Sequence, residues 1–138
     1  MLISSKGRYA LRIMLDLAEN SNGQFIPLKD MTVRQNISQK YLESIMVMLS
    51  KNGFVEAMHG KGGGYKLCKA PCEYKIGDIL RLTEGTLTPV MCLEENAPIC
   101  ERASTCQTLP LWSGLNKVIC EYLDGISLED ILQKGKDL

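Results

Sequence analysis

The sequence predicts a mainly α-helical fold with a small β-hairpin: a winged helix-turn-helix followed by a long C-terminal dimerisation helix. Three observations support this fold class. Apolar residues recur at helical spacing along several segments, and two short strand-like segments flank a glycine-rich connection. One helical segment near the C-terminus also carries more apolar residues than a lone helix can bury. The 138 residues can form one modest core, which buries about two-thirds of the unfolded surface.

Three helices are expected in the first part of the chain. The first covers residues 4–18, where apolar side chains recur at intervals of three and four, and the polar run at 20–23 ends it. A short helix follows at 28–35. Ser38 is then a suitable N-cap for a third helix at 39–51. Because a tight turn joins the second and third helices, this pair has the plan of a helix-turn-helix.

The middle of the chain predicts a hairpin and one further helix. Strands are expected at 54–58 and 65–69, and the connection between them, H-G-K-G-G-G, has almost no side-chain bulk. A helix is expected at about 76–82, stopped by Gly85. The segment 86–108 is too polar and irregular to form an ordinary helix or strand.

Two helices are expected at the C-terminal end. Pro110 opens a long helix at 111–123, and Ser127 and Asp130 form a capping pattern for a last short helix. The expected organisation is a winged helix-turn-helix domain at 1–85 (helix-turn-helix about 28–51, wing 54–69), a cysteine-containing effector loop at 86–108, and a region at 109–138 with the dimerisation helix and the short helix.

A helix-turn-helix with a wing indicates DNA binding. The second helix of such a unit enters the major groove with its N-terminal residues on base edges. A glycine-rich wing tip permits close approach to phosphates or to the minor groove. Two alternatives stay open: a helical hairpin that only packs, and a phosphate-binding nucleotide loop, although that loop needs a following helix where a strand is expected. The predicted DNA contacts are Ser38, Gln39, Lys40, Tyr41, Glu43 and Ser44 on the helix, and His59 and Lys61 on the wing.

Charge is distributed unevenly along the chain, although the net charge is zero. Residues 1–75 carry eleven Lys and Arg against six Asp and Glu, a net of +5, whereas residues 76–138 carry five against ten, a net of −5. A basic front half fits a surface that faces phosphates. No segment approaches the roughly 18 uninterrupted apolar residues of a membrane span, and no signal-peptide pattern is present, so a cytoplasmic protein is expected.

Three cysteines, Cys92, Cys100 and Cys106, occur in the irregular segment with the spacing C-x7-C-x5-C. Clustered thiols in a chain without a secretion signal are more often metal or redox ligands than disulfides. Structural zinc usually needs a close cysteine pair and four ligands, which this loop lacks. From the residues alone, an iron–sulfur cluster, redox-active thiols, zinc and no ligand role all stay open.

The remaining reactive side chains indicate no catalytic site. Cys68 is expected to point inward from the second strand as a small core residue, and Cys120 to pack near the dimer contact. The single histidine, His59, is on the expected wing tip and far in sequence from the three loop cysteines. A cysteine–histidine nucleophile would need it inside a cleft, so such a pair is not expected. The acidic residues of the C-terminal half fall on helix surfaces and form no acid–base pair. The chain is therefore predicted not to be an enzyme.

Several motifs together resemble one bacterial family. They are the opening S-S-K-G-R-Y-A-L-R-I-M-L-D-L-A, the turn and helix I-S-Q-K-Y-L-E, the wing H-G-K-G-G-G-Y-K-L, the segment I-G-D-I-L-R-L-T-E-G and the tail L-D-G-I-S-L-E-D-I-L. Over nearly its whole length the chain is similar to the winged-helix regulators that include the iron–sulfur cluster regulator IscR, the nitric-oxide sensor NsrR and the cysteine-metabolism regulator CymR. The resemblance implies a homodimeric transcription factor, with repression favoured, that binds double-stranded DNA at a pseudo-palindromic operator. It also implies base contacts by Lys40, Tyr41, Glu43 and Ser44.

The resemblance further implies that Cys92, Cys100 and Cys106 hold an iron–sulfur cluster that modulates DNA binding, with 2Fe–2S favoured over 4Fe–4S. Clusters usually take four ligands, so one is missing. Leu109 and Arg8 stand where IscR has a histidine ligand and NsrR an aspartate from the partner subunit, and neither can ligate. A cluster with a weak or external ligand would be labile and easily lost in air. The other candidates are Glu94, Glu95, Glu101, Ser104, Thr105, Gln107 or an exogenous small ligand.

The wing departs from the family at His59, where IscR has an arginine that enters the minor groove. A neutral imidazole attracts the narrow, negative groove less than a guanidinium does. Lys61 can take over this role, and a wing contact that is weaker or sensitive to pH is expected.

Two rival functions come from other classes. One is a regulator of the same fold without a cofactor, switched by a partner protein or by thiol oxidation. The other is a cluster-carrying redox or assembly protein whose winged helix serves protein contacts. A steep salt dependence of DNA binding would argue against the second rival, because phosphate contacts release counterions.

Overall fold

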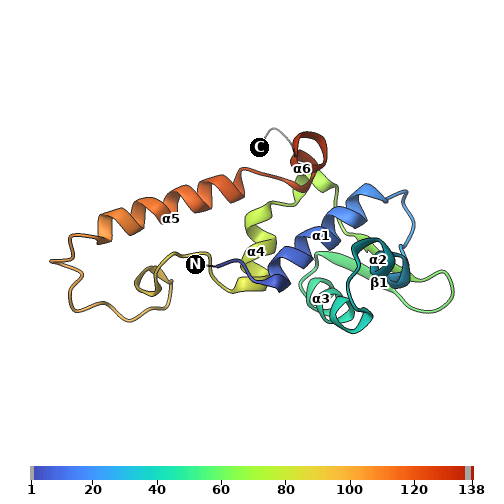
Figure 1. Ribbon diagram of the computed structural model, residues 1–138, viewed down its shortest axis with the longest axis horizontal. Helices are drawn as coiled ribbons and strands as arrows, with labels where there is room; N and C mark the ends of the chain where they lie inside the picture. The colour runs from blue at the N-terminus through green and yellow to red at the C-terminus, as the bar shows by residue number, and fades with distance from the viewer. Residues whose placement is uncertain (1, 136–137) are drawn as a thin grey trace.

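The computed structural model describes residues 2–135 and residue 138, and in this part it contains six α-helices and one two-stranded antiparallel sheet (Figure 1). The predicted fold class is confirmed. The predicted helices at 28–35 and 39–51 are correct to the residue, and the ends of the other three long helices differ from prediction by at most two residues. The elements are α1 (Ser5–Glu19), α2 (Leu28–Gln35), α3 (Gln39–Lys51), β1 (Val55–Met58), β2 (Gly64–Leu67), η1 (Pro71–Glu73), α4 (Ile76–Glu84), η2 (Met91–Leu93), α5 (Leu109–Asp124) and α6 (Leu128–Lys134).

Helix α1 lies at the centre of the fold and contacts α2, α4, α6 and β2. The side-chain oxygen of Ser4 caps its start by accepting a hydrogen bond from the Gly7 N–H at 3.1 Å. Ile13, Met14 and Leu17 lie on its inner side and are at most 1% exposed. Each such side chain stabilises the fold by about 1.5–3 kcal/mol relative to an exposed one. The core around α1 therefore holds the helix-turn-helix, the wing and α4 as one body.

The wing is a hairpin in which Val55 of β1 lies opposite Leu67 of β2. A backbone bridge that the sequence did not predict joins the hairpin to the segment before α2: Ile26 and Tyr65 exchange two hydrogen bonds of 2.8 and 2.9 Å. Gly64 permits this bridge, because its φ is +152° and a Cβ there would collide with the Ile26 carbonyl. The base of the wing is thus tied to the start of the helix-turn-helix.

The prediction that Cys68 points into the core is wrong. Strand β2 ends at Leu67, and Cys68 is exposed. The buried Tyr74 explains the early end, since its hydroxyl accepts hydrogen bonds from the N–H groups of Cys68 and Lys69 at 2.9 and 3.1 Å and donates to the Phe54 carbonyl at 2.7 Å. Because the N–H groups of Cys68 and Lys69 donate to Tyr74, they do not pair with β1, and strand β2 ends before position 68.

Helix α5 extends away from the body, whereas α6 folds back onto it (Figure 1). Leu128 at the start of α6 is fully buried, and its N–H donates to the Tyr74 carbonyl at 3.1 Å. Helix α6 packs against α1 and η1, so the chain returns to the first core after α5. In the described part of the chain, no helix has the combined length and apolar character needed to cross a membrane.

Candidate functional site

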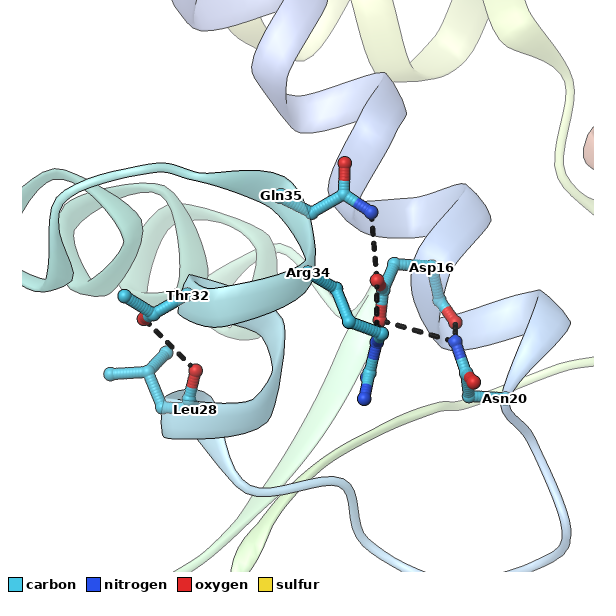
Figure 2. A network of polar contacts seen from close by, with 6 residues as sticks. All are labelled: Asp16, Asn20, Leu28, Thr32, Arg34 and Gln35. Carbon is cyan, nitrogen blue, oxygen red and sulfur yellow. Dashed lines mark hydrogen bonds and ion pairs between the residues drawn. The ribbon is translucent and has the colours of Figure 1, made fainter.

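The first helix of the helix-turn-helix is held on α1 by a buried carboxylate (Figure 2). Asp16 is 2% exposed and accepts two hydrogen bonds from Arg34, at 2.7 and 3.0 Å, and one from Gln35 Nε2 at 2.7 Å. This carboxylate raises the pKa of the Arg34 guanidinium, chiefly through the hydrogen bonds. A buried charge costs little only when it is paired in this way. Sequence reasoning missed Asp16, whose signal was an acidic residue beside the apolar positions of α1.

A second contact joins the same elements on the outside. Arg12 of α1 donates to the Gln35 side-chain oxygen at 3.2 Å and to the Gln35 carbonyl. Its guanidinium also lies 5.1 Å from the centre of the Tyr9 ring. Tyr9 in turn meets the ring of Tyr41 edge-on, with centroids 5.5 Å apart. Helix α1 therefore positions both α2 and the N-terminal turn of α3.

The predicted base-contacting residues gather at the N-terminal end of α3. Ser38 caps the helix by accepting from the Tyr41 N–H at 3.3 Å. Gln39 Nε2 donates to Glu43 Oε1 at 3.0 Å, and the Ser44 hydroxyl donates to the Tyr41 carbonyl at 2.7 Å. Tyr41 is half-buried against Tyr9, whereas the other predicted contacts on α3 are exposed: Ser38, Gln39, Lys40, Glu43 and Ser44.

The wing tip presents His59 and Lys61, which are both exposed. Gly60 and Gly62 have φ values of +89° and +77°, and the Gly63 N–H donates to the Gly60 carbonyl at 3.0 Å. The tip is therefore a tight glycine turn with little side-chain bulk around its two basic residues. A strand follows it, which argues against the nucleotide-loop alternative. The wing lies at the same end of the molecule as α2 and α3, and α5 extends from the opposite end (Figure 1).

The three loop cysteines share one hollow of about 210 Å³, where the loop turns back toward the start of α5. All three are free thiols. Among the described residues, however, no group of three His, Cys, Asp or Glu side chains is close enough to hold a metal ion. The sulfurs therefore line a common space without converging on one point. The other residues around the hollow are Ala97, Pro98, Ile99, Ala103 and Leu109.

Thiolate sulfur is the donor that iron–sulfur clusters use, so the donor set of this hollow fits three of the four usual positions. The contacts of Cys106 favour its thiolate form, which is the form that ligates iron. The Thr108 hydroxyl, 3.4 Å from its sulfur, lowers the pKa of the Cys106 thiol, and the backbone N–H groups of Thr108 and Leu109 at the start of α5 add to this effect. Amides at a helix N-terminus favour a thiolate in the same way.

A second hollow, of about 390 Å³, separates α4 and α5 from the first part of the loop. Glu94 and Glu95 line it, together with Asn116 and Cys120 of α5. Cys120 is half-buried there, with its sulfur 3.9 Å from the Asn116 side-chain oxygen. Cys120 therefore lines a pocket within its own chain, and its place near the dimer contact stays a prediction.

Helices α4 and α5 are joined by Arg81 and Asp124. Arg81 Nη1 and Nη2 each donate to one Asp124 carboxylate oxygen at 2.8 Å. The guanidinium lowers the pKa of Asp124, and the carboxylate raises the pKa of Arg81. Helix α4 ends just before the cysteine loop, and α5 begins just after it. This ion pair therefore connects the helix before the loop to the helix after it.

Helix α5 has a row of exposed apolar side chains. Among its described residues none is buried, and Leu111 and Val118 are 61% and 62% exposed. An apolar row of this size is uncommon on a monomer and is typical of an interaction surface. The members of the α5 apolar row are Leu111, Leu115, Val118 and Tyr122.

Comparison with known proteins identifies relatives over the whole chain. A family model described as Rrf2, iron-dependent transcriptional regulator, matches residues 3–134. The HTH-type transcriptional regulator IscR of Pectobacterium carotovorum is 36% identical over 138 residues, which cover 100% of this chain and 83% of the relative.

Solved structures give the same result. The global cysteine regulator CymR of B. subtilis has a TM-score of 0.76 at 34% identity, over 95% of each chain. The structure of IscR from T. potens has a TM-score of 0.75 at 31% identity, over 100% of this chain and 92% of that one. The named relatives are transcriptional regulators, in agreement with the prediction that the chain is not an enzyme.

Proposed function

This chain belongs to the Rrf2 family of transcriptional regulators, and we propose that it binds a pseudo-palindromic operator as a homodimer under the control of an iron–sulfur cluster on Cys92, Cys100 and Cys106. The observation that carries the proposal is the single hollow that all three cysteines line. It lies at the N-terminal end of α5, away from the DNA-binding end (Figure 1). The molecule thus carries an effector region and a DNA-binding region.

The DNA-binding part of the proposal rests on α3 and the wing. The exposed N-terminal turn of α3 enters the major groove, where Lys40 donates to base edges or phosphates and Glu43 accepts from cytosine. His59 and Lys61 follow the neighbouring phosphates or minor groove. Tyr41 contributes its hydroxyl, while its ring stays packed on Tyr9. Operator affinity should therefore fall steeply with salt, because each neutralised phosphate releases counterions.

The dimer rests on the α5 apolar row. A second copy of α5 would cover Leu111, Leu115, Val118 and Tyr122, and two heads joined in this way would meet two half-sites. The spacing between the heads then depends on how α5 leaves the body. The pair Arg81–Asp124 links the C-terminal end of α5 to α4 in each subunit and so influences that direction.

The effector part rests on where the loop begins and ends. The segment 86–108 starts after α4 and ends at Leu109, the first residue of α5. When bound, an iron–sulfur cluster supplies a redox-active, oxygen-labile centre. Cys106 offers a stabilised thiolate, and closure of Cys92 and Cys100 toward it would order the loop. An ordered loop would bias the position of α5 relative to α4, and with it the spacing of the DNA-binding heads.

The test is an anaerobic preparation with absorption spectrum, iron assay and sulfide assay, repeated on Cys92→Ala. Wild-type protein should bind iron and sulfide in equal amounts, and the variant should bind much less. Operators are then selected from random duplexes, and the affinities of loaded and cluster-free protein are compared at fixed salt. Equal affinities for every selected operator would end the sensing role while leaving the DNA-binding role intact.

A second candidate function is regulation by the thiols themselves. It is favoured by the free cysteines and by the lack, among the described residues, of three ligands within reach of one ion. In that case anaerobic protein would be colourless, and mild oxidation would change operator affinity. Replacement of Cys100 by Ser would remove the response to oxidant.

A further inference from the structure

We infer that Val47 of α3 is a further specificity-determining residue, which contacts the C5 methyl group of a thymine in the major groove of the operator. The inference rests on the DNA-binding part of the proposed function and is independent of the cysteine loop. It extends that function by identifying a residue outside the predicted set of DNA contacts, together with the base that this residue selects.

Val47 is an apolar side chain on the exposed side of α3. It is 49% exposed, although the adjacent Met46 is fully buried. In the described part of the chain, Val47 neither belongs to the hydrophobic core nor packs against it, whereas every other apolar residue of α3 does one or the other. Valine is also a weaker helix former than alanine or lysine. Neither core packing nor helix propensity therefore explains a valine at this position.

Val47 lies on the same face of α3 as the proposed base contacts. Lys40, Glu43 and Ser44 precede it by seven, four and three residues, and an α-helix brings these spacings onto one side. All four side chains are exposed. The recognition helix of homeodomains contacts base edges with residues at this same spacing. If the three polar side chains enter the groove, Val47 therefore enters with them.

Hydrogen bonds within α3 occupy part of the polar capacity of this face. The Ser44 hydroxyl donates to the Tyr41 carbonyl at 2.7 Å, so its only proton is already used. The Glu43 carboxylate accepts from Gln39 at 3.0 Å and has no proton to donate. Val47 adds two methyl groups beside them. The part of the face around Val47 therefore suits a hydrocarbon group on the DNA better than a hydrogen-bonding base edge.

Thymine is the base that presents such a group. Its C5 methyl projects into the major groove, where the other bases present hydrogen-bond donors and acceptors. Contact between this methyl and the valine side chain removes hydrocarbon surface of both from water. Val47 lies about 10.5 Å along the helix axis from Lys40, which is about three times the base-pair spacing of about 3.4 Å. The two residues therefore contact different base pairs.

The test removes the methyl group from the DNA and most of the side chain from Val47. Operators are first selected from random duplexes with the full-length wild-type protein. Each thymine of a selected operator is then replaced, in both half-sites, by deoxyuridine, which lacks only the C5 methyl. At one position per half-site this replacement should weaken wild-type binding by about tenfold. Val47→Ala should bind the thymine and deoxyuridine duplexes equally.

Val33→Ala is the matched control. It also shortens an exposed valine of the helix-turn-helix, but this valine lies on α2 and not on the helix that enters the groove. The control variant should keep the full wild-type response to deoxyuridine. Val47→Ala should remain folded in urea unfolding, because alanine replaces an exposed valine with a better helix former.

The outcomes separate the inference from the proposed function. If wild-type protein enriches no sequence, sequence-specific DNA binding fails, and the inference fails with it. If it binds a selected operator but no thymine responds to deoxyuridine, only the inference is overturned. The inference is overturned as well if Val47→Ala keeps the wild-type response, because another residue then contacts the methyl group or the methyl acts through the shape of the duplex.

Discussion

Asp16 of α1 and Arg34 of α2 form a two-point ion pair, with Arg34 Nη2 2.7 Å from Asp16 Oδ1 and Arg34 Nε 3.0 Å from Asp16 Oδ2. The carboxylate is 2% exposed, whereas the Arg34 side chain is 37% exposed. Gln35 donates a third hydrogen bond to the same carboxylate. This buried acidic residue therefore makes a large polar contribution to the attachment of α2, which braces α3, to the core.

Replacing Asp16 by Ala should lower the free energy of unfolding by about 2 kcal/mol. Losing a partner of a buried ion pair costs about 3–5 kcal/mol, and the solvent exposure of Arg34 reduces this figure. Urea unfolding with an unchanged m-value would measure the effect. Glu19→Ala is the matched control, since it removes an exposed carboxylate from the same helix. Equal stabilities of the two variants would contradict the prediction.

Much of the fold follows from local signals. The N-cap Ser38 and the regular apolar spacing of 39–51 predict α3 correctly, and the glycines at 60–64 predict the wing turn. The bridge between Ile26 and Tyr65 has no local signal, because a single pair of residues carries no periodicity. The early end of β2 depends on the Tyr74 hydroxyl, which lies six residues beyond Cys68 and is positioned only by the tertiary fold.

The sequence predicts only part of the candidate site, again because contacts made by the tertiary fold have no local signal. The spacing of Cys92, Cys100 and Cys106 predicts a shared place, and the structure puts the three in one hollow. Sequence distance cannot show that Glu94, two residues from Cys92, faces a different hollow. Nor can it show that Asp16 needs Arg34, because their contact spans 18 positions.

The pair Arg81–Asp124 should make stability depend on pH in the acid range. Arg81 lowers the pKa of Asp124 in the folded state below its ordinary value of 3.8. The stability from this group is therefore fully present above about pH 3.8 and is lost as pH falls through the lower folded value. Asp124→Asn should flatten the stability curve below that pH. A curve for Asp124→Asn with the wild-type acid slope would show that other carboxylates cause the loss.

Cys106 should be the most readily alkylated of the loop cysteines in cluster-free protein near pH 7. The Thr108 hydroxyl lowers the pKa of this thiol, so a larger fraction is thiolate. Thr108→Ala should shift the pH dependence of iodoacetamide labelling at Cys106 to higher pH, as followed by peptide mass spectrometry. Thr105→Ala, whose hydroxyl donates to a backbone carbonyl instead, should leave the labelling profile unchanged.

His59→Arg should strengthen operator binding at pH 8 by roughly threefold to tenfold. A guanidinium keeps its charge at this pH and is attracted to a narrow minor groove. If the new cation meets a phosphate, the salt dependence should steepen by about 0.9 in slope. Fluorescence anisotropy at several salt concentrations measures both quantities. Gln133→Arg adds the same charge on α6, outside the helix-turn-helix and wing, and an equal gain in that variant would assign the effect to net charge alone.

Two substitutions at Tyr41 should show whether this residue positions α3 or contacts DNA. Its ring packs edge-on against Tyr9 at 5.5 Å, and such a pair contributes about 0.5–1.5 kcal/mol beyond burial. Tyr41→Phe keeps the ring, so its unfolding curve should match wild type, while loss of a single hydroxyl hydrogen bond to a base should weaken operator binding by about 0.5–1.5 kcal/mol. Tyr41→Ala should lose both stability and affinity. If Tyr41→Phe binds the operator as tightly as wild type, the hydroxyl makes no DNA contact, and Tyr41 acts only by holding the first turn of α3 against α1.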